Sequence, residues 1–171
     1  LHADIYLEAT TARALAQLAD AAKCDSKVVD ERLAHWAKAR AAYDAANAAA
    51  REKALAANVI DAVGLAAVAA EILRQDTIYV DETITHMPVM RPHPPLNRPQ
   101  SFFRVTGGAL GQGIGAALGT KLAAKDHPVV LFVGDGSFLY NPIIQALGAS
   151  KAYDLPIMIV VCNNKLYEAM R

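Results

Sequence analysis

An acidic residue between two glycines follows one apolar run of this sequence, and two asparagines follow the next. The first pattern is Gly134-Asp135-Gly136 after VVLFV, and the second is Asn163-Asn164 after IMIVVC. A buried carboxylate is costly without a partner, so Asp135 is expected to meet a positive charge. Mg²⁺ prefers oxygen ligands and completes its octahedron with phosphate oxygens and water. These residue types therefore predict a Mg²⁺ site to which Asp135 and either Asn163 or Asn164 contribute oxygens.

The residues beside Asp135 suit a phosphate group. Gly134 and Gly136 are expected to let the backbone turn sharply and to bring N–H groups close to phosphate oxygens. Ser137 adds a hydroxyl donor. The pattern therefore predicts a diphosphate that binds through Mg²⁺ at this point of the chain.

Strands must bring the two patterns together. The runs 129–133 and 157–162 are almost entirely apolar, as in parallel strands that are covered on both faces. A helix from Pro142 to Tyr153, capped by Asn141, is predicted between them. A right-handed crossover then places the residues after both strands at one edge of the sheet, where open α/β sheets bind ligands. The predicted fold class is α/β, with a doubly wound parallel sheet.

Three further segments belong to the predicted domain. A helix that begins near Ile60 precedes TIYVDE, which predicts a strand over residues 77–82. Residues 82–104 hold five of the eight prolines and predict a long loop that is largely without regular structure. Residues 107–125, GGALGQGIGAALGTKLAAK, predict a glycine-rich turn that enters a helix.

The first third of the chain has a different character. Residues 3–9, ADIYLEA, predict a short strand, and Thr10 or Thr11 is expected to cap the helix that follows. Residues 27–57 are rich in alanine and charge, with a narrow apolar stripe that predicts a long helix. We interpret this helix as a linker, with a non-catalytic helical interaction module as the alternative.

Composition limits the partners of the chain. The 171 residues carry 17 basic and 17 acidic side chains, so no global field favours nucleic acid or an anionic membrane. No apolar stretch reaches the length of a membrane-spanning helix. Two cysteines far apart, Cys24 and Cys162, and the lack of a signal-peptide pattern predict a cytoplasmic protein. Cys162 is expected to be a buried strand residue rather than a nucleophile.

The combination of GDG with NN after 26 further residues resembles the signature of thiamine-diphosphate enzymes. The stretches VDET, GGALGQGIGAALG, GDGS and NNKLYEAMR resemble the branch of acetolactate synthase and of the benzoylformate and pyruvate decarboxylases, from about residue 59 to 171. The resemblance implies thiamine diphosphate and Mg²⁺ as cofactors and a 2-oxo acid as substrate. It also implies decarboxylation, with protonation of the enamine or its transfer to an acceptor carbonyl, in a homodimer or homotetramer.

The resemblance also implies roles for individual residues. The implied metal ligands are Asp135, Asn164 and the backbone carbonyl of Leu166. The residues implied to lie at the diphosphate are Thr83, Thr85, Gly136, Ser137 and Tyr167. Leu110 is implied to bend the thiamine, and the Gly108 carbonyl to accept a hydrogen bond from its 4'-amino group.

The same resemblance implies a domain organisation. Residues 1–24 correspond to the tail of a central domain, 25–57 to a linker helix, and 58–171 to the N-terminal part of an incomplete diphosphate-binding domain. The glutamate that activates the cofactor is expected on a pyrimidine-binding domain outside this sequence. No catalytic residue is therefore predicted here, and the segment alone is expected to be inactive.

Two observations leave alternatives open. Residues 111–116 satisfy G-x-G-x-x-A, and Asp135 follows about 20 residues later, as in a nicotinamide-dependent oxidoreductase. Against this interpretation, SFFRVTGG makes a poor buried strand, and the paired asparagines would have no role. His86 and His93 lie in the predicted loop, where an imidazole is either solvated or able to transfer protons at neutral pH.

Overall fold

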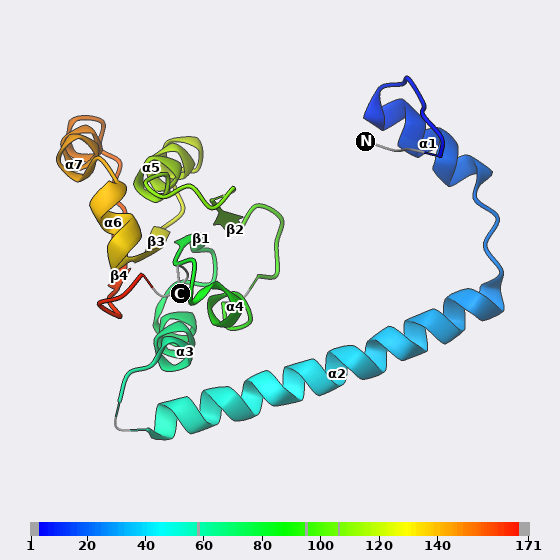
Figure 1. The fold of residues 1–171 in the computed structure, drawn as a ribbon, viewed down its shortest axis with the longest axis horizontal. Helices are drawn as coiled ribbons and strands as arrows, with labels where there is room; N and C mark the ends of the chain where they lie inside the picture. Colours follow the sequence, from blue (N-terminus) through cyan, green and yellow to red (C-terminus); the bar gives the residue numbers. More distant parts are fainter. Residues whose placement is uncertain (1–3, 58, 95, 106, 168–171) are drawn as a thin grey trace. The chain divides into compact units, whose positions relative to one another are not determined.

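The computed structural model describes residues 4–57, 59–94, 96–105 and 107–167. The chain divides into two compact units, Leu1–Ala45 and Ala46–Arg171, and we call the second the sheet unit. Figure 1 labels the helices and strands in chain order. Each unit is described by itself.

The N-terminal third is helical. Helix α1 covers Thr11–Ala21, with Thr10 at its cap position, although the Thr10 side chain makes no capping hydrogen bond. Helix α2 covers Ser26–Ala56, and the Asp25 carboxylate accepts a hydrogen bond of 2.9 Å from the Lys27 N–H at its start. Both predicted helices are confirmed. The strand predicted at 3–9 is wrong over the described residues 4–9, which have no regular structure, because an extended segment without a pairing neighbour has no partners for its backbone groups.

The sheet unit contains a four-stranded parallel sheet in the order β2-β1-β3-β4. The strands are β1 Ile78–Glu82, β2 Phe102–Arg104, β3 Val129–Gly134 and β4 Met158–Cys162. The register pairs Glu82 with Val133 and Gly134 with Cys162, so β1, β3 and β4 end at the same edge. The predicted parallel α/β sheet is confirmed.

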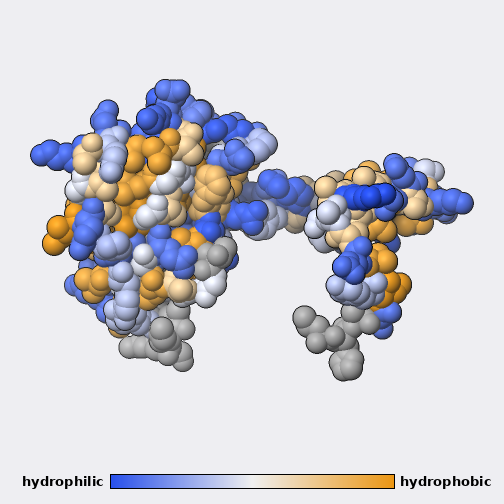
Figure 2. Space-filling model, turned by 90° about the horizontal axis from the view of Figure 1, so that it is seen from above, coloured by the Kyte–Doolittle hydropathy of each residue, from blue (hydrophilic) through white to orange (hydrophobic). Residues whose placement is uncertain are grey.

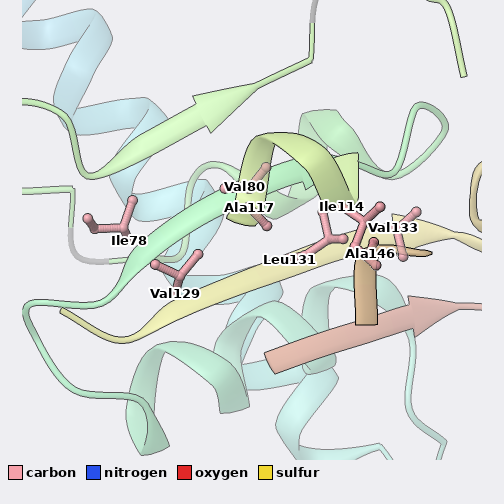
Figure 3. Packing of buried hydrophobic residues seen from close by; sticks show 8 residues of the cluster. All are labelled: Ile78, Val80, Ile114, Ala117, Val129, Leu131, Val133 and Ala146. Carbon is pink, nitrogen blue, oxygen red and sulfur yellow. The ribbon is translucent and has the colours of Figure 1, made fainter. Parts of the chain in front are cut away.

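Helices cover both faces of this sheet. They are α3 Ala62–Ile72, α4 Met87–Met90, α5 Gly113–Ala123, α6 Asp135–Tyr140 and α7 Ile143–Ala152. Val80 and Leu131 pack with α5 and α7 through a cluster that Figure 3 shows from close by. Their neighbours Tyr79 and Phe132 belong to a second cluster, which α3 and α4 complete. This alternation explains why the strands read as continuous apolar runs.

Three local predictions need correction. The segment 82–104 contains α4 and the edge strand β2, because Pro88 sits where a helix start needs no N–H and because β2 pairs with β1 alone. The residues after β3 form helix α6 rather than a turn. Asn141 does not cap α7, which has Pro142 at its cap position, because the Asn141 side chain is bonded elsewhere.

The hydropathy of the surface and of the helices bears on contact with a membrane. Figure 2 shows hydrophilic and hydrophobic residues side by side on the visible surface. Within the described ranges, we find no helix whose length and apolar content would let it cross a membrane.

Candidate functional site

The carboxyl ends of β1, β3 and β4 border a cavity of about 230 Å³. All ten residues to which the resemblance assigned a ligand role line this cavity, although they come from segments up to 84 positions apart, whereas Asn163, the alternative metal ligand, does not line it. They are Thr83, Thr85, Gly108, Leu110, Asp135, Gly136, Ser137, Asn164, Leu166 and Tyr167. Their gathering in one place is thus a finding, whereas their roles as ligands stay predictions.

Asp135 is the acidic residue among the described residues that line the cavity. It is half-buried at the first position of α6, and no described residue forms a hydrogen bond or an ion pair with its carboxylate. Within the described ranges no three His, Cys, Asp or Glu side chains could share a metal ion. A cation at Asp135 would therefore take its other ligands from amide, carbonyl and phosphate oxygens, which is the donor set that Mg²⁺ accepts.

The segment after β4 forms two overlapping side-chain turns. The Leu166 N–H donates to Asn164 Oδ1 at 3.0 Å, and the Lys165 N–H donates to Asn163 Oδ1 at 2.9 Å. These bonds fold Leu166 back beside Asn164, at the rim of the cavity that both line. Lys165 adopts a left-handed φ of 59°, a conformation that costs a side-chain-bearing residue energy and favours glycine. The site therefore depends on a turn that this sequence builds with an unfavourable residue.

The two glycines beside Asp135 do not form the predicted turn, whereas contact of their N–H groups with phosphate stays a prediction. Gly134 is extended, with φ −69° and ψ 151°, and Gly136 lies within α6, so neither supplies a left-handed turn. Gly136 instead permits close packing, because a Cβ there would lie 2.6 Å from Tyr167 Cε1. At Gly134 a Cβ would meet no atom closer than 3.7 Å. The absence of a side chain is therefore needed at Gly136 for contact with the Tyr167 ring.

The end of β1 distinguishes the two predicted threonines. The Thr83 hydroxyl and the Thr83 N–H both donate to Asp81 Oδ1, at 2.7 and 2.9 Å. Its hydroxyl proton is thus already used, which favours Thr85 as the donor to a phosphate. Ile84 between them has a φ of 45°, which is rare for a β-branched residue and costs on the order of 1–3 kcal/mol. This strained residue sets the direction in which Thr85 leaves the strand.

Glu82 is the residue of this region that the sequence analysis missed. The residue is 1% exposed, and its two carboxylate oxygens accept hydrogen bonds from the turn before α5 and from Asn141. The partners lie 29 to 59 residues away, so no local pattern signalled them. The only hint was an acid at the end of an otherwise apolar strand.

The same hydrogen bonds oppose the nicotinamide interpretation. A dinucleotide that uses G-x-G-x-x-A binds its pyrophosphate to the N–H groups at the start of the following helix. Here the N–H groups of Gly111, Gln112 and Gly113 donate to Glu82. A buried carboxylate already occupies the place of that anion.

The structure also places the two histidines of the predicted loop and Cys162 relative to the cavity. His86 lines the cavity, whereas His93 does not. The pKa of His93 is lowered by burial and by the nearby charge of Arg51. Cys162 is buried as predicted, and its pKa is raised to about 11 by burial and by the charges of Asp81 and Asp135. A thiol with this pKa is protonated at neutral pH, which argues against a nucleophile.

Comparisons with known proteins agree with this geometry. A family model described as "Thiamine pyrophosphate enzyme, C-terminal TPP binding domain" matches residues 84–171. Benzoylformate decarboxylase of Pseudomonas aeruginosa is 32% identical over 97 residues, which make up 57% of this chain and 18% of that protein. The large subunit of acetolactate synthase isozyme 3 from Escherichia coli is 39% identical over 72 residues, which make up 42% of this chain and 12% of that protein.

A solved structure gives the same result. The thiamine diphosphate-dependent 4-hydroxybenzoylformate decarboxylase of Rhodococcus jostii RHA1 matches with a TM-score of 0.60 and 32% identity, over 65% of this chain and 21% of that one. The chain therefore spans about a fifth or less of the length of these relatives.

Proposed function

This chain belongs to the thiamine pyrophosphate enzyme family, and on that premise we propose that it is part of an enzyme that decarboxylates a 2-oxo acid. The product is either protonated or transferred to an acceptor carbonyl, as the names of its decarboxylase and synthase relatives suggest. The observation that carries the proposal is the unpaired carboxylate of Asp135, in one cavity with the Asn164 amide and Leu166.

The cavity fits the diphosphate end of the cofactor. Asp135, Asn164 and the Leu166 carbonyl would hold Mg²⁺, and the Ser137 and Thr85 hydroxyls would donate to phosphate oxygens. When bound, thiamine diphosphate supplies a nucleophilic carbon and accepts the electron pair that CO₂ leaves behind.

The thiamine end of the cofactor would meet a different part of the same cavity. There Leu110 would press the thiamine into its bent form, and the Gly108 carbonyl would accept a hydrogen bond from its amino group. The residues of this chain therefore bind and orient the cofactor, while the activating glutamate is expected elsewhere in the protein.

The surroundings of the site are proposals as well. We assign residues 1–24 to the tail of a central domain, 25–57 to a linker helix and 58–171 to the N-terminal part of the diphosphate-binding domain. The whole protein would work as a homodimer or homotetramer in the cytoplasm. The alternative role of 27–57 as an interaction module stays a prediction, because the family match begins at residue 84.

Calorimetric titration of the full-length protein that contains this chain tests the proposal. Thiamine diphosphate should bind in the presence of Mg²⁺ and lose affinity when the metal is chelated. Asp135→Asn should weaken Mg²⁺-dependent binding by about tenfold or more, because it removes the charged metal ligand. The matched control is Asp126→Asn, which changes an exposed acid in the loop before β3, at the opposite end of that strand. Binding that needs no Mg²⁺, or that Asp135→Asn leaves unchanged, would refute the assignment.

A further inference from the structure

We propose that Glu82 is a positioning residue for the cofactor, which acts by holding the turn that carries Gly108 and Leu110. The inference rests on the proposed function, because it concerns how the thiamine end of the same cavity is built. Glu82 itself does not line the cavity. Its effect reaches the site through the backbone of residues 111–113.

The Glu82 carboxylate is fully used as an acceptor. Oε1 accepts from the N–H groups of Gly111 and Gln112, at 2.8 and 2.9 Å. Oε2 accepts from the Gly113 N–H and from Asn141 Nδ2, both at 2.9 Å. With the group 1% exposed, these four donors replace the water that an isolated carboxylate would require. All four are N–H donors, so the ionised form, which only accepts, matches the site.

The carboxylate also lies at the start of helix α5. The first N–H groups of an α-helix have no partner within the helix, and its positive end favours a negative charge. Three consecutive N–H groups here converge on the one side chain that ends β1. Glu82 therefore attaches the turn before α5 to the centre of the sheet.

The turn is confined from its other side by α6. Gly107, Gly108 and Gly111 have left-handed φ angles of 78°, 68° and 95°. A Cβ on Gly111 would lie 2.5 Å from the backbone oxygen of Tyr140, so the turn passes directly over the end of α6. Leu110 immediately precedes this contact. Its position is thus set between the Tyr140 backbone and the Glu82 carboxylate.

The geometry separates two ends of the cavity. Asp135 and Asn164 follow β3 and β4, and no hydrogen bond joins either of them to Glu82 within the described residues. Leu110 and Gly108 belong to the turn that Glu82 holds. Loss of one Glu82 oxygen should therefore impair binding of the thiamine end more than binding of the diphosphate end.

Calorimetry of the full-length protein with two ligands tests this separation. The ligands are Mg²⁺-thiamine diphosphate and Mg²⁺-pyrophosphate, and the variant Glu82→Gln turns one acceptor oxygen into a donor that faces N–H groups. Affinity for thiamine diphosphate should fall by about tenfold or more, the loss expected for a charge-assisted hydrogen bond, while affinity for pyrophosphate stays within about twofold. Glu82→Asp keeps the charge and should recover part of the loss. Glu71→Gln makes the same chemical change at an exposed side chain of α3 and should change neither affinity.

Three results would overturn the inference. Equal losses for both ligands would indicate a general structural role, and unchanged affinities would show that the turn does not depend on Glu82. If Glu82→Gln does not fold, hydrogen exchange of residues 111–113 in the unliganded wild type decides instead, since rapid exchange would contradict bonded N–H groups. A wild type that binds no thiamine diphosphate would refute the proposed function, which distinguishes that failure from a failure of the Glu82 inference alone.

Discussion

Replacement of Gly113 by alanine should destabilise the sheet unit, because this glycine touches Glu82. A Cβ at Gly113 would lie 2.5 Å from Glu82 Oε2 and 3.0 Å from Leu131 Cδ1. Leu131 and Glu82 are each 1% exposed, so neither can move into free space. Overpacking of such a site costs about 1–3 kcal/mol. Loss of charge-assisted hydrogen bonds to Oε2 adds about 1.5–3 kcal/mol.

A small gain opposes these costs, because alanine favours a helix over glycine by about 1 kcal/mol. The net loss expected for Gly113→Ala is therefore about 1.5–5 kcal/mol. The matched control is Gly119→Ala on the same helix, where an added Cβ would meet nothing within 4 Å. That variant should gain about 0.5–1 kcal/mol from helix propensity alone.

Hydrogen exchange of β3, followed by mass spectrometry, measures both effects within the sheet unit. Where exchange requires unfolding, each change of 1.4 kcal/mol in the free energy of unfolding changes the exchange rate by about tenfold. Gly113→Ala should thus accelerate exchange by about tenfold or more, whereas Gly119→Ala should slow it. The reasoning fails if Gly113→Ala stays within about threefold of the wild type, or if both variants shift exchange equally in one direction.

Three further predictions test other parts of the sheet unit. Gly136→Ala would place a Cβ 2.6 Å from the ring of Tyr167, a half-exposed side chain that can swing outward. Exchange of β3 should stay unchanged while affinity for Mg²⁺-thiamine diphosphate falls, and unchanged affinity would contradict a role for this ring. Cys162 has a pKa of about 11, so at pH 8 about one thiol in a thousand is a thiolate, and alkylation should be slower than that of the thiolate by this factor. The rate of alkylation should then rise about tenfold for each pH unit up to pH 11. The exposed Cys24 serves as the internal reference, and a plateau for Cys162 below pH 10 would refute the raised pKa. Lys121→Met keeps the buried stem but removes the ammonium that donates to two backbone carbonyls at 2.7 and 2.8 Å. It should cost about 1–3 kcal/mol in thermal unfolding, and an unchanged midpoint would show that these bonds contribute nothing.

The contribution of Cys162 to the free energy of unfolding should also decrease as the pH rises. Its pKa is raised on folding, so the folded state keeps a proton that the unfolded state loses. This contribution is complete below about pH 9 and declines as the pH rises toward about 11.

Sequence reasoning succeeded where local pattern and topology suffice. The runs at 129–133 and 157–162 predicted β3 and β4 because both faces of a central parallel strand are buried. Adjacent parallel strands end at one edge, so the neighbourhood of Asp135 and Asn164 followed without any knowledge of side-chain conformations.

The missed elements depend on partners that are distant in sequence. Strand β2 has three residues, and only its pairing with β1 makes them a strand. Asn141 is a reasonable helix cap by local rules, but its amide bonds to the Glu82 carboxylate and to the Ser137 carbonyl. A buried partner for each of its polar groups outweighs a cap, which water could replace.

The three acids at the carboxyl ends of β1 and β3 show what the structure adds to the predicted cation site. Asp81 and Glu82 are adjacent on a strand, so their side chains point to opposite faces of the sheet. The first accepts two hydrogen bonds from Thr83, and the second accepts four from N–H groups. Both carboxylates therefore have a structural use, although Asp81 Oδ2 is buried without a partner. Asp135 alone lines the cavity without a described hydrogen-bond donor, and so it is the acid whose charge a metal ion can balance.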